Sequence, residues 1–362
     1  GHYSSDPEGT SRILEMRQMI MALHGMGLRV VMDQVYNHTD STGLDAFTST
    51  FDKLVPGYYY RRNVINGVVE GGNCINCTAS ENRMMAKFME DSTVYWAEHY
   101  SIDAFRYDLM GFHPRQVMLD VLAAVREVDE DTNMWGEGWS PDPGSSALND
   151  AIFETATQGN MGDTDIGTFN DHSRNALRTG GLFGGNADAI RIGLAGNLVD
   201  YSFYSATGQL VSGSDVSGYS TDPSNNIFYV TSHDDGNLFD FMQINLPDNL
   251  PTSDRVRAQN MTSSAVLLGQ GIPFIHMGAD ILRSKSLDRN SYDSGDWFNR
   301  VDFTYEDNNW NNGLPPNTID GSDNAVVSAN ELSVVGQAEI TFAHEVFKEF
   351  LEISQSSPLF SL

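Results

Sequence analysis

Helical and strand-like hydrophobic patterns alternate along most of the chain. Between residues 11 and 24, apolar residues recur every three or four positions, which predicts an amphipathic helix. Further helices are predicted over 81–100, 114–130, 253–268 and 339–354. Short, continuously apolar runs predict strands over 28–32, 102–107, 132–135, 166–169, 227–230 and 272–276. Continuous apolar runs are typical of a buried parallel sheet, so the pattern favours an α/β fold.

The order of these elements predicts six of the eight βα units of a TIM (β/α)8 barrel. An open doubly wound sheet of this length usually carries a glycine-rich phosphate loop, and the sequence holds neither a GxGxxG nor a Walker pattern. On this interpretation, residues 1–362 form one catalytic barrel domain that is a fragment, with the first two βα units missing upstream. Loops are predicted over 39–80 and 205–225.

The charge balance narrows the class of partner. The 362 residues include 21 Lys and Arg against 49 Asp and Glu, a net charge of −28. Such a chain repels phosphate backbones and anionic membrane surfaces, which argues against a nucleic-acid partner. The sequence has no run of about 18 apolar residues, so no membrane insertion is predicted. A neutral substrate is compatible with this charge.

The two cysteines, Cys74 and Cys77, form a lone CxxC pattern. A structural zinc site needs four soft ligands, and the sequence offers no second pair of cysteines. The pattern therefore favours a local loop or a local disulfide over a zinc site.

Polar residues cluster directly after four of the predicted strands. The clusters are Asp33, Asn37 and His38; Arg106 and Asp108; Glu137 and Trp139; and His233, Asp234 and Asp235. A single Asp at a strand end is usually a turn or cap residue, because its side chain bonds free backbone amides. Four clusters after separate parallel strands instead predict an active site, since barrel enzymes keep their chemistry at the carboxyl ends of the strands.

Asp108 and Glu137 form a pair of carboxylates on neighbouring predicted strands. A retaining glycosidase needs such a pair, one as nucleophile and one as acid and then base. Arg106 lies two residues before Asp108, so it points to the same side of the strand and would keep Asp108 ionised. Glu137 has no neighbouring cation in the sequence and is flanked by Trp135 and Trp139, which predicts a raised pKa and a proton-donor role.

These residues resemble the four signature regions of the alpha-amylase superfamily of glycoside hydrolases. The regions correspond to DQVYNH at 33–38, DAFRYD at 103–108, WGEGW at 135–139 and YVTSHD at 229–234. Within that superfamily the chain resembles the type I pullulanases, which cut α-1,6 links, and the likeness covers almost its whole length. The narrower match rests on residues 55–59, 81–86, 108–111, 136–139 and 283–299.

The resemblance implies a retaining enzyme that cleaves α-1,6-glucosidic linkages in pullulan, amylopectin and limit dextrins. Asp108 would be the nucleophile, Glu137 the acid/base and Asp234 a third carboxylate that binds hydroxyls of the distorted sugar. The implied substrate-binding residues are Asp33, His38, Arg106, Trp139, His233, Asp296 and Arg300. Two alternatives stay open: another superfamily enzyme (isoamylase, neopullulanase or branching enzyme), or a catalytically impaired glucan-binding relative.

Further expectations follow from the resemblance alone. It implies an extracellular or cell-surface location, N-terminal β modules and a C-terminal β-sandwich outside this chain, and no organic cofactor. It also implies Ca2+, for which the acidic segments 162–165 and 293–296 are candidates, although neither has an EF-hand pattern and no metal ligand is assigned. The oligomeric state is not predicted.

Asp235 departs from the family pattern, which usually has Asn after the His–Asp pair. A second carboxylate beside Asp234 predicts a raised pKa for one of the two, with lower activity or a shifted pH optimum.

Overall fold

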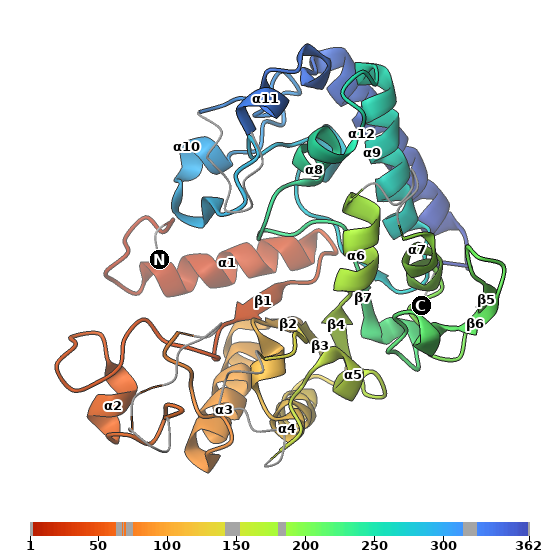
Figure 1. Ribbon diagram of the computed structural model, residues 1–362. Helices are drawn as coiled ribbons and strands as arrows, with labels where there is room; N and C mark the ends of the chain where they lie inside the picture. The colour runs from red at the N-terminus through yellow and green to blue at the C-terminus, as the bar shows by residue number, and fades with distance from the viewer. Residues whose placement is uncertain are drawn as a thin grey trace. The chain divides into compact units, whose positions relative to one another are not determined.

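The computed structural model describes residues 3–62, 67, 69, 75–141, 153–179, 186–313 and 324–360. The chain divides into two compact units, unit 1 over Gly1–Phe169 and unit 2 over Asn170–Leu362. Each unit combines helices with parallel strands (Figure 1). The predicted α/β class is therefore confirmed.

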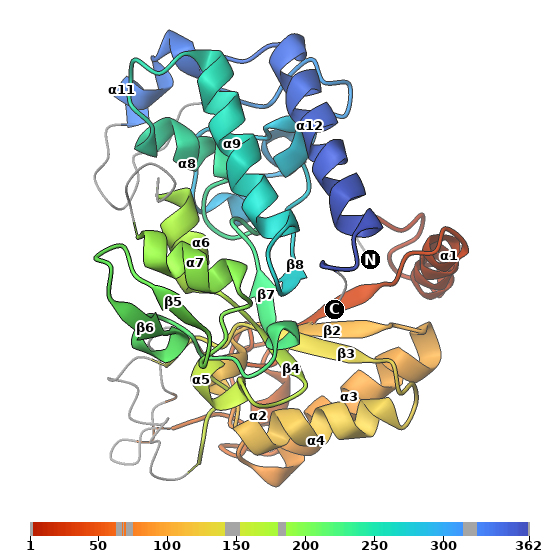
Figure 2. The same ribbon diagram turned by 90° about the vertical axis from the view of Figure 1, so that its right-hand side faces the viewer.

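Unit 1 is built on four parallel strands, and neighbours in the sequence are neighbours in the sheet (Figure 2). The strands are β1 (Val31–Gln34), β2 (Ala104–Tyr107), β3 (Asn133–Gly136) and β4 (Ile166–Phe169). The helices are α1 (Ser11–Gly25), α2 (Thr50–Leu54), α3 (Arg83–Tyr100), the 3-10 turn η1 (Met110–Phe112), α4 (Arg115–Arg126) and α5 (Gln158–Met161).

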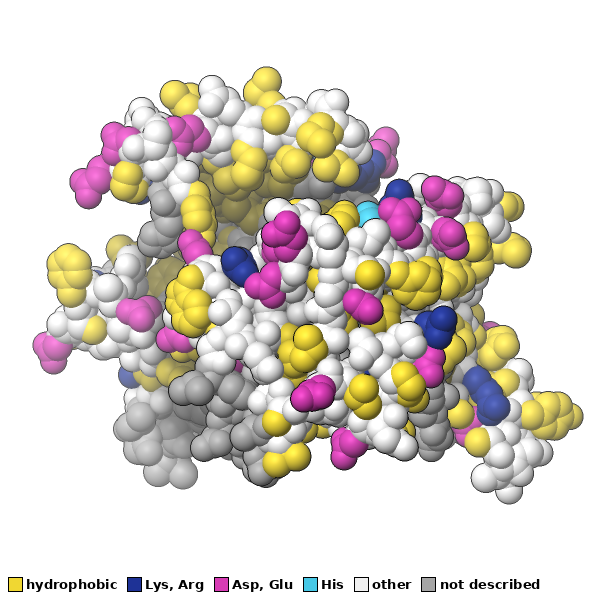
Figure 3. Space-filling view, turned by 90° about the horizontal axis from the view of Figure 1, so that it is seen from above, with side chains coloured by type: hydrophobic (Ala, Val, Ile, Leu, Met, Phe, Trp, Pro, Cys, Tyr) yellow, Lys and Arg dark blue, Asp and Glu magenta, His cyan; other side chains and the backbone are white. Residues whose placement is uncertain are grey.

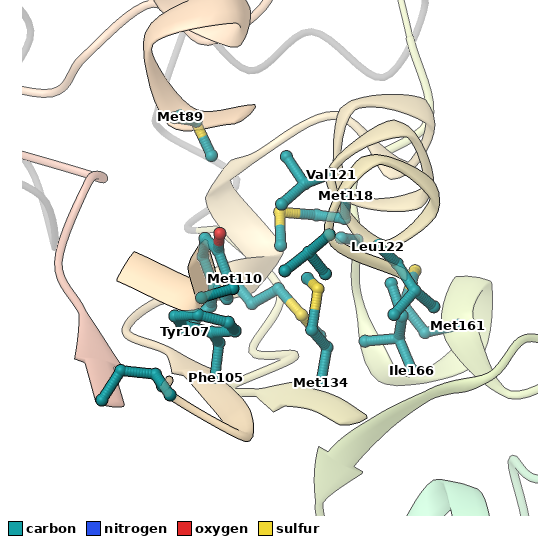
Figure 4. Close-up of a cluster of buried hydrophobic side chains, with 14 of the residues drawn as sticks. Met89, Phe105, Tyr107, Met110, Met118, Val121, Leu122, Met134, Met161 and Ile166 are labelled. Atoms are coloured by element: carbon teal, nitrogen blue, oxygen red, sulfur yellow. The ribbon is translucent and has the colours of Figure 1, made fainter. Parts of the chain in front are cut away.

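The core of unit 1 lies between its strands and helices α3 and α4. All four residues of β2 are buried, as expected for a strand covered on both faces. Helix α4 buries Met118, Val121, Leu122 and Val125, a stripe at helical spacing. Figure 4 shows Met118, Val121 and Leu122 of this stripe beside Met134, Ile166 and Met161. This packing fixes the ends of β2 and β3, where the predicted catalytic carboxylates begin.

Unit 2 contains a parallel strand pair, an antiparallel hairpin and several helices. Its strands are the hairpin β5 (Ser202–Tyr204) and β6 (Leu210–Ser212) and the parallel pair β7 (Asn226–Phe228) and β8 (Ile272–Pro273). Its α-helices are α6 (Asp171–Arg178), α7 (Ala187–Leu194), α8 (Leu238–Asn245), α9 (Thr252–Leu267), α10 (Asp296–Asn299), α11 (Asn324–Ser328) and α12 (Gln337–Ser356). Its 3-10 turns are η3 (Gly213–Asp215), η4 (Pro223–Asn225), η5 (Ala279–Ile281), η6 (Ser291–Asp293) and η7 (Glu331–Ser333).

All six predicted strands are present, although several boundaries differ. β7 ends at Phe228 and β8 at Pro273, earlier than predicted. The predicted loop 39–80 contains the short helix α2, and the predicted loop 205–225 contains β6, so both loop predictions are wrong in part. Phe203 pairs in register with Val211, which explains the hairpin in a segment rich in Ser and Gly.

Helices α6, α7 and α8 are absent from the sequence prediction. Each has only eight residues, too few for a clear helical period. Their Asn caps are the signal that could have located them. The side chains of Asn170 and Asn186 accept hydrogen bonds from the backbone N–H of Ser173 and Ala189, the standard N-cap contact.

The surface carries the acidic excess of the sequence. Figure 3 shows Asp and Glu side chains scattered over one face, with few basic side chains between them. Among the helices within the described ranges, none combines the length and apolarity needed to cross a bilayer.

His113, directly after η1, is a buried ionisable group in unit 1. Its Nδ1 lies 2.8 Å from the Ser80 hydroxyl. Burial, with a contribution from the Arg61 guanidinium, lowers the pKa of His113 to about 3. The unfolded chain would protonate this imidazole near pH 6.5, so the folded state binds fewer protons below that pH.

His113 should therefore make the fold sensitive to acid. As the pH falls from 6.5 towards 4.5, the free energy of unfolding of the wild-type chain should fall by about 1.4 kcal/mol per pH unit relative to that of His113→Gln. The variant lacks this dependence because glutamine does not titrate. Urea unfolding of both proteins across this range measures the difference. Parallel stability curves would contradict a neutral, buried His113.

Candidate active site

The strand register of unit 1 brings four charged side chains to one face of the sheet. Asp33 on β1 pairs in register with Arg106 on β2, which pairs with Trp135 on β3. Asp108 and Glu137 come two residues after Arg106 and Trp135, so they project from the same face. The backbone N–H of Asp108 donates to Gln34 O (3.0 Å), and that of Glu137 donates to Tyr107 O (3.1 Å), which continues the ladder to both carboxylates.

Arg106 is the centre of this group. Its Nη1 lies 2.8 Å from Asp33 Oδ1 and 2.8 Å from Asp108 Oδ1, and its Nη2 lies 2.8 Å from Glu137 Oε1. The Arg106 side chain is only 9% exposed. Burial acts to lower the pKa of Arg106, but Glu137, Asp33 and Asp108 together raise it above its ordinary value. The cation is therefore permanent, and it holds the carboxylates of β2 and β3 together.

The prediction that Glu137 has no cation beside it is wrong. Sequence neighbours alone suggested it, whereas the parallel register sets Arg106 beside Trp135 and within reach of Glu137. An adjacent guanidinium favours the ionised form of a carboxylate. In the structure, the Glu137 carboxyl group is thus paired with the Arg106 guanidinium.

The backbone around Glu137 is also specialised. Leu109 donates its N–H to Glu137 Oε2 (2.9 Å) while adopting the left-handed conformation (φ 43°), which is unfavourable for a branched side chain. Gly111 allows η1 to pack closely, because a Cβ at that position would lie 2.0 Å from the carbonyl oxygen of Trp139. Trp139 itself is half-buried at this contact.

Asn37 is a site residue that the substrate-binding prediction omitted, although it lies in the polar cluster after the first strand. It is buried, and its Nδ2 donates to the Asp108 carbonyl (2.9 Å) and to Asp108 Oδ2 (2.8 Å). Its Oδ1 lies 2.5 Å from His38 Nδ1. Because the amide nitrogen serves Asp108, Oδ1 must accept from the protonated Nδ1, and His38 keeps Nε2 for another partner.

The predicted site residues divide between the two units. Unit 1 holds Asp33, His38, Arg106, Asp108, Glu137 and Trp139, and unit 2 holds His233, Asp234, Asp296 and Arg300.

In unit 2, His233 and Asp234 lie on the turn after β7. Their side chains are 59% and 65% exposed, and His233 Nε2 lies 3.5 Å from Asp234 Oδ1. Asp296 is exposed in the first turn of α10, and Arg300 forms an ion pair with Asp307.

The sequence predicted a raised pKa for one of the adjacent carboxyls Asp234 and Asp235. For Asp235 this prediction is wrong. Burial would raise the pKa of this carboxyl, but a hydrogen bond from Arg289 and the charge of Arg178 lower it below its ordinary value. Arg178 Nη1 lies 2.8 Å from Asp235 Oδ2. The carboxylate is paired with arginines that are remote in the sequence, which sequence neighbours could not reveal.

In the acidic segment 162–165, one of the two candidates for calcium, both carboxylates form ion pairs. Asp163 pairs with Arg115 (2.9 Å) and Asp165 with Arg126 (2.7 Å), so arginines occupy both carboxylates of segment 162–165. Across the part of the chain that is described, no three His, Cys, Asp or Glu side chains converge to hold a metal ion. Cys77 is disulfide-bonded, and Cys74 lies outside the described residues.

The chain is similar to known proteins along its entire length. The pullulanase of Klebsiella pneumoniae is 38% identical over 402 residues, covering 100% of this chain and 36% of the relative. The chloroplastic pullulanase 1 of Arabidopsis thaliana is 37% identical, covering 100% of this chain and 42% of the relative. The chain is a homologue of pullulanases. It spans well under half the length of these two relatives.

Solved structures and a family model agree with this homology. PulA from Klebsiella oxytoca matches 100% of the chain and 37% of its own, with 38% identity and a TM-score of 0.93. A Klebsiella pneumoniae pullulanase complexed with maltotriose matches 100% of the chain and 38% of its own, with 37% identity and a TM-score of 0.92. Residues 305–362 match the family described as alpha-1,6-glucosidases, pullulanase-type, C-terminal.

The carboxylate cluster of this pullulanase homologue predicts a large cost for removing Arg106. Arg106→Gln should lower the free energy of unfolding on the order of 3 kcal/mol, because three carboxylates would crowd together without their shared cation. Urea unfolding measures this loss. The matched control is Arg29→Gln, since Arg29 and Asp131 form an exposed pair 3.8 Å apart, whose loss should cost less than about 1 kcal/mol. Equal losses in the two variants would contradict the central position of Arg106.

Proposed function

We propose that this pullulanase homologue hydrolyses α-1,6-glucosidic linkages in pullulan, amylopectin and limit dextrins, with retention at the anomeric carbon. The observation that carries the proposal is the Arg106 guanidinium, which contacts Asp108 and Glu137 at the carboxyl ends of adjacent parallel strands. Sharing one guanidinium keeps the two carboxyl groups close, as the retaining mechanism requires. Homology to pullulanases over the whole chain supports the choice of linkage.

In the proposed first step, the carboxyl group of Glu137 is protonated and no longer paired with Arg106. It donates its proton to the glycosidic oxygen. Asp108 attacks the anomeric carbon, the bond from that carbon to the glycosidic oxygen breaks, and a glycosyl ester forms on Asp108. In the second step, Glu137 takes a proton from water, the water oxygen attacks the anomeric carbon, and Asp108 departs as a carboxylate. Two inversions give net retention.

The remaining residues position these groups and the sugar. Arg106 stays paired with Asp108, and Asp33 contacts the same Arg106 nitrogen, Nη1. Asn37 fixes the Asp108 carboxylate and leaves His38 Nε2 to bind a sugar hydroxyl. By resemblance, His233 and Asp234 bind hydroxyls of the distorted sugar, and Trp139, Asp296 and Arg300 bind neighbouring glucose units.

Three broader statements are part of the proposal. The six parallel strands belong to a TIM (β/α)8 barrel, which the position of the site residues after the strands supports. The protein works outside the cell, which the disulfide at Cys77 supports, because disulfides persist in oxidising compartments. Calcium binding stays a prediction from the resemblance, without assigned ligands.

Pullulan digestion tests the proposed function. The 362-residue chain, shown by circular dichroism to be folded, should release maltotriose from pullulan. Glu137→Gln should lower the turnover roughly 10²–10⁴-fold because general acid/base catalysis is lost, and Asp108→Asn should lower it at least as much. Chromatography of the products measures both.

Asp91→Asn is the matched control, because Asp91 is an exposed helical carboxylate paired with Lys87. It should leave turnover unchanged. Panose in place of maltotriose would move the assignment to a neopullulanase. No product from a folded wild-type chain, or full turnover by Glu137→Gln, would overturn the proposal.

A further inference from the structure

The side chains of His233 and Asp234 have little support of their own. Both are more than half exposed, and the 3.5 Å contact with His233 is the one ion pair that Asp234 makes within the described ranges. Exposed side chains with so few contacts take their position from the backbone that carries them. The residues that hold the backbone of the turn after β7, called its anchors below, therefore decide where Asp234 lies.

Asp235 is the first of these anchors. Its backbone is left-handed (φ 64°), a conformation that Asp tolerates better than most residues but that costs free energy unless other contacts hold it. Its carboxylate accepts from Arg289 Nε (2.5 Å) and lies 2.8 Å from Arg178 Nη1. The two guanidiniums lie over the ring of Phe241, with their Cζ atoms 4.4 and 5.7 Å from its centroid.

The pair Arg178–Asp235 is shielded from water. The Arg178 side chain is 11% exposed and that of Asp235 is 23% exposed. A buried guanidinium without its counter-charge is costly, so Arg178 at the end of α6 needs a carboxylate at position 235. An amide at this position would remove the negative charge that Arg178 meets in the turn.

Lys285 is the second anchor. It is buried, and its Nζ donates to the carbonyl oxygens of His233 (2.5 Å) and Asp235 (2.8 Å), on either side of Asp234. The backbone N–H of Lys285 donates to Asp240 Oδ2 (2.9 Å) in α8. The segment that contains Lys285 and Arg289 is thus bound to the turn at both carbonyls and at the Asp235 carboxylate.

We infer that Asp235 is a positioning residue that, together with Lys285, holds the backbone of Asp234 in the orientation needed to bind substrate. The inference rests on the proposed function of Asp234. It also assigns a purpose to the Asp235 carboxylate, which supplies a counter-charge for Arg178 and Arg289. Asparagine, which carries no charge, should be harmful at this position.

Two measurements on the full chain test the positioning role. Asp235→Asn should lower kcat/KM for pullulan about 10²-fold through misplacement of Asp234. The double variant Asp234→Asn/Asp235→Asn should then be no slower than Asp234→Asn alone, because Asp235 acts through Asp234. Hydrogen exchange should be faster over residues 229–240 in Asp235→Asn and, to a smaller extent, in Arg289→Gln, which removes one arm of the anchor.

Asp254→Asn is the matched control, since Asp254 forms an exposed pair with Arg257 on α9 of the same unit. It should change neither measurement. Additive losses in the double variant, or wild-type exchange over 229–240 in both anchor variants, would overturn the inference. If wild-type protein does not cleave pullulan, the proposed function fails, and the exchange measurement still decides whether Asp235 anchors the turn.

Discussion

The buried cation Arg106 organises the candidate active site of unit 1. Three carboxylates from three consecutive parallel strands lie within 2.8 Å of its nitrogens. Without the arginine, these carboxylates would repel one another, and without them the arginine would be a buried, uncompensated charge. The sheet must therefore hold β1, β2 and β3 in one register, because a slip of one residue would send the side chains of a strand to the opposite face.

A similar arrangement with the charges reversed occurs in unit 2. There the carboxylate of Asp235 lies between Arg178 and Arg289, and Phe241 covers both guanidiniums. In each unit, partly buried ion pairs hold residues in place. In unit 1 these residues carry the proposed chemistry, and in unit 2 the residue held is the neighbour of Asp234. Such pairs contribute less to net stability than to a unique geometry, because desolvation offsets much of their attraction. Their main effect is therefore to position the site residues.

The sequence predicted those features that depend on local patterns. Continuous apolar runs located all six strands, and the two-residue spacing placed Arg106 beside Asp108. Features that depend on register or on distant partners were missed or mistaken. Glu137 meets Arg106 only through the pairing of β2 with β3, and Asp235 meets arginines 57 positions before it and 54 after it. No pattern in a single sequence encodes such contacts.

The assignment of Asp108 as nucleophile can be tested by trapping the glycosyl ester. Glu137→Gln treated with α-maltosyl fluoride should form the ester, because fluoride leaves without a proton, and should hydrolyse it slowly, because the base is missing. Mass spectrometry of the digested protein should then find the added maltosyl mass on the peptide that contains Asp108. A maltosyl adduct on a different carboxylate, or rapid hydrolysis of the fluoride with no adduct at all, would contradict the pairing of Asp108 and Glu137 around Arg106 as the catalytic centre.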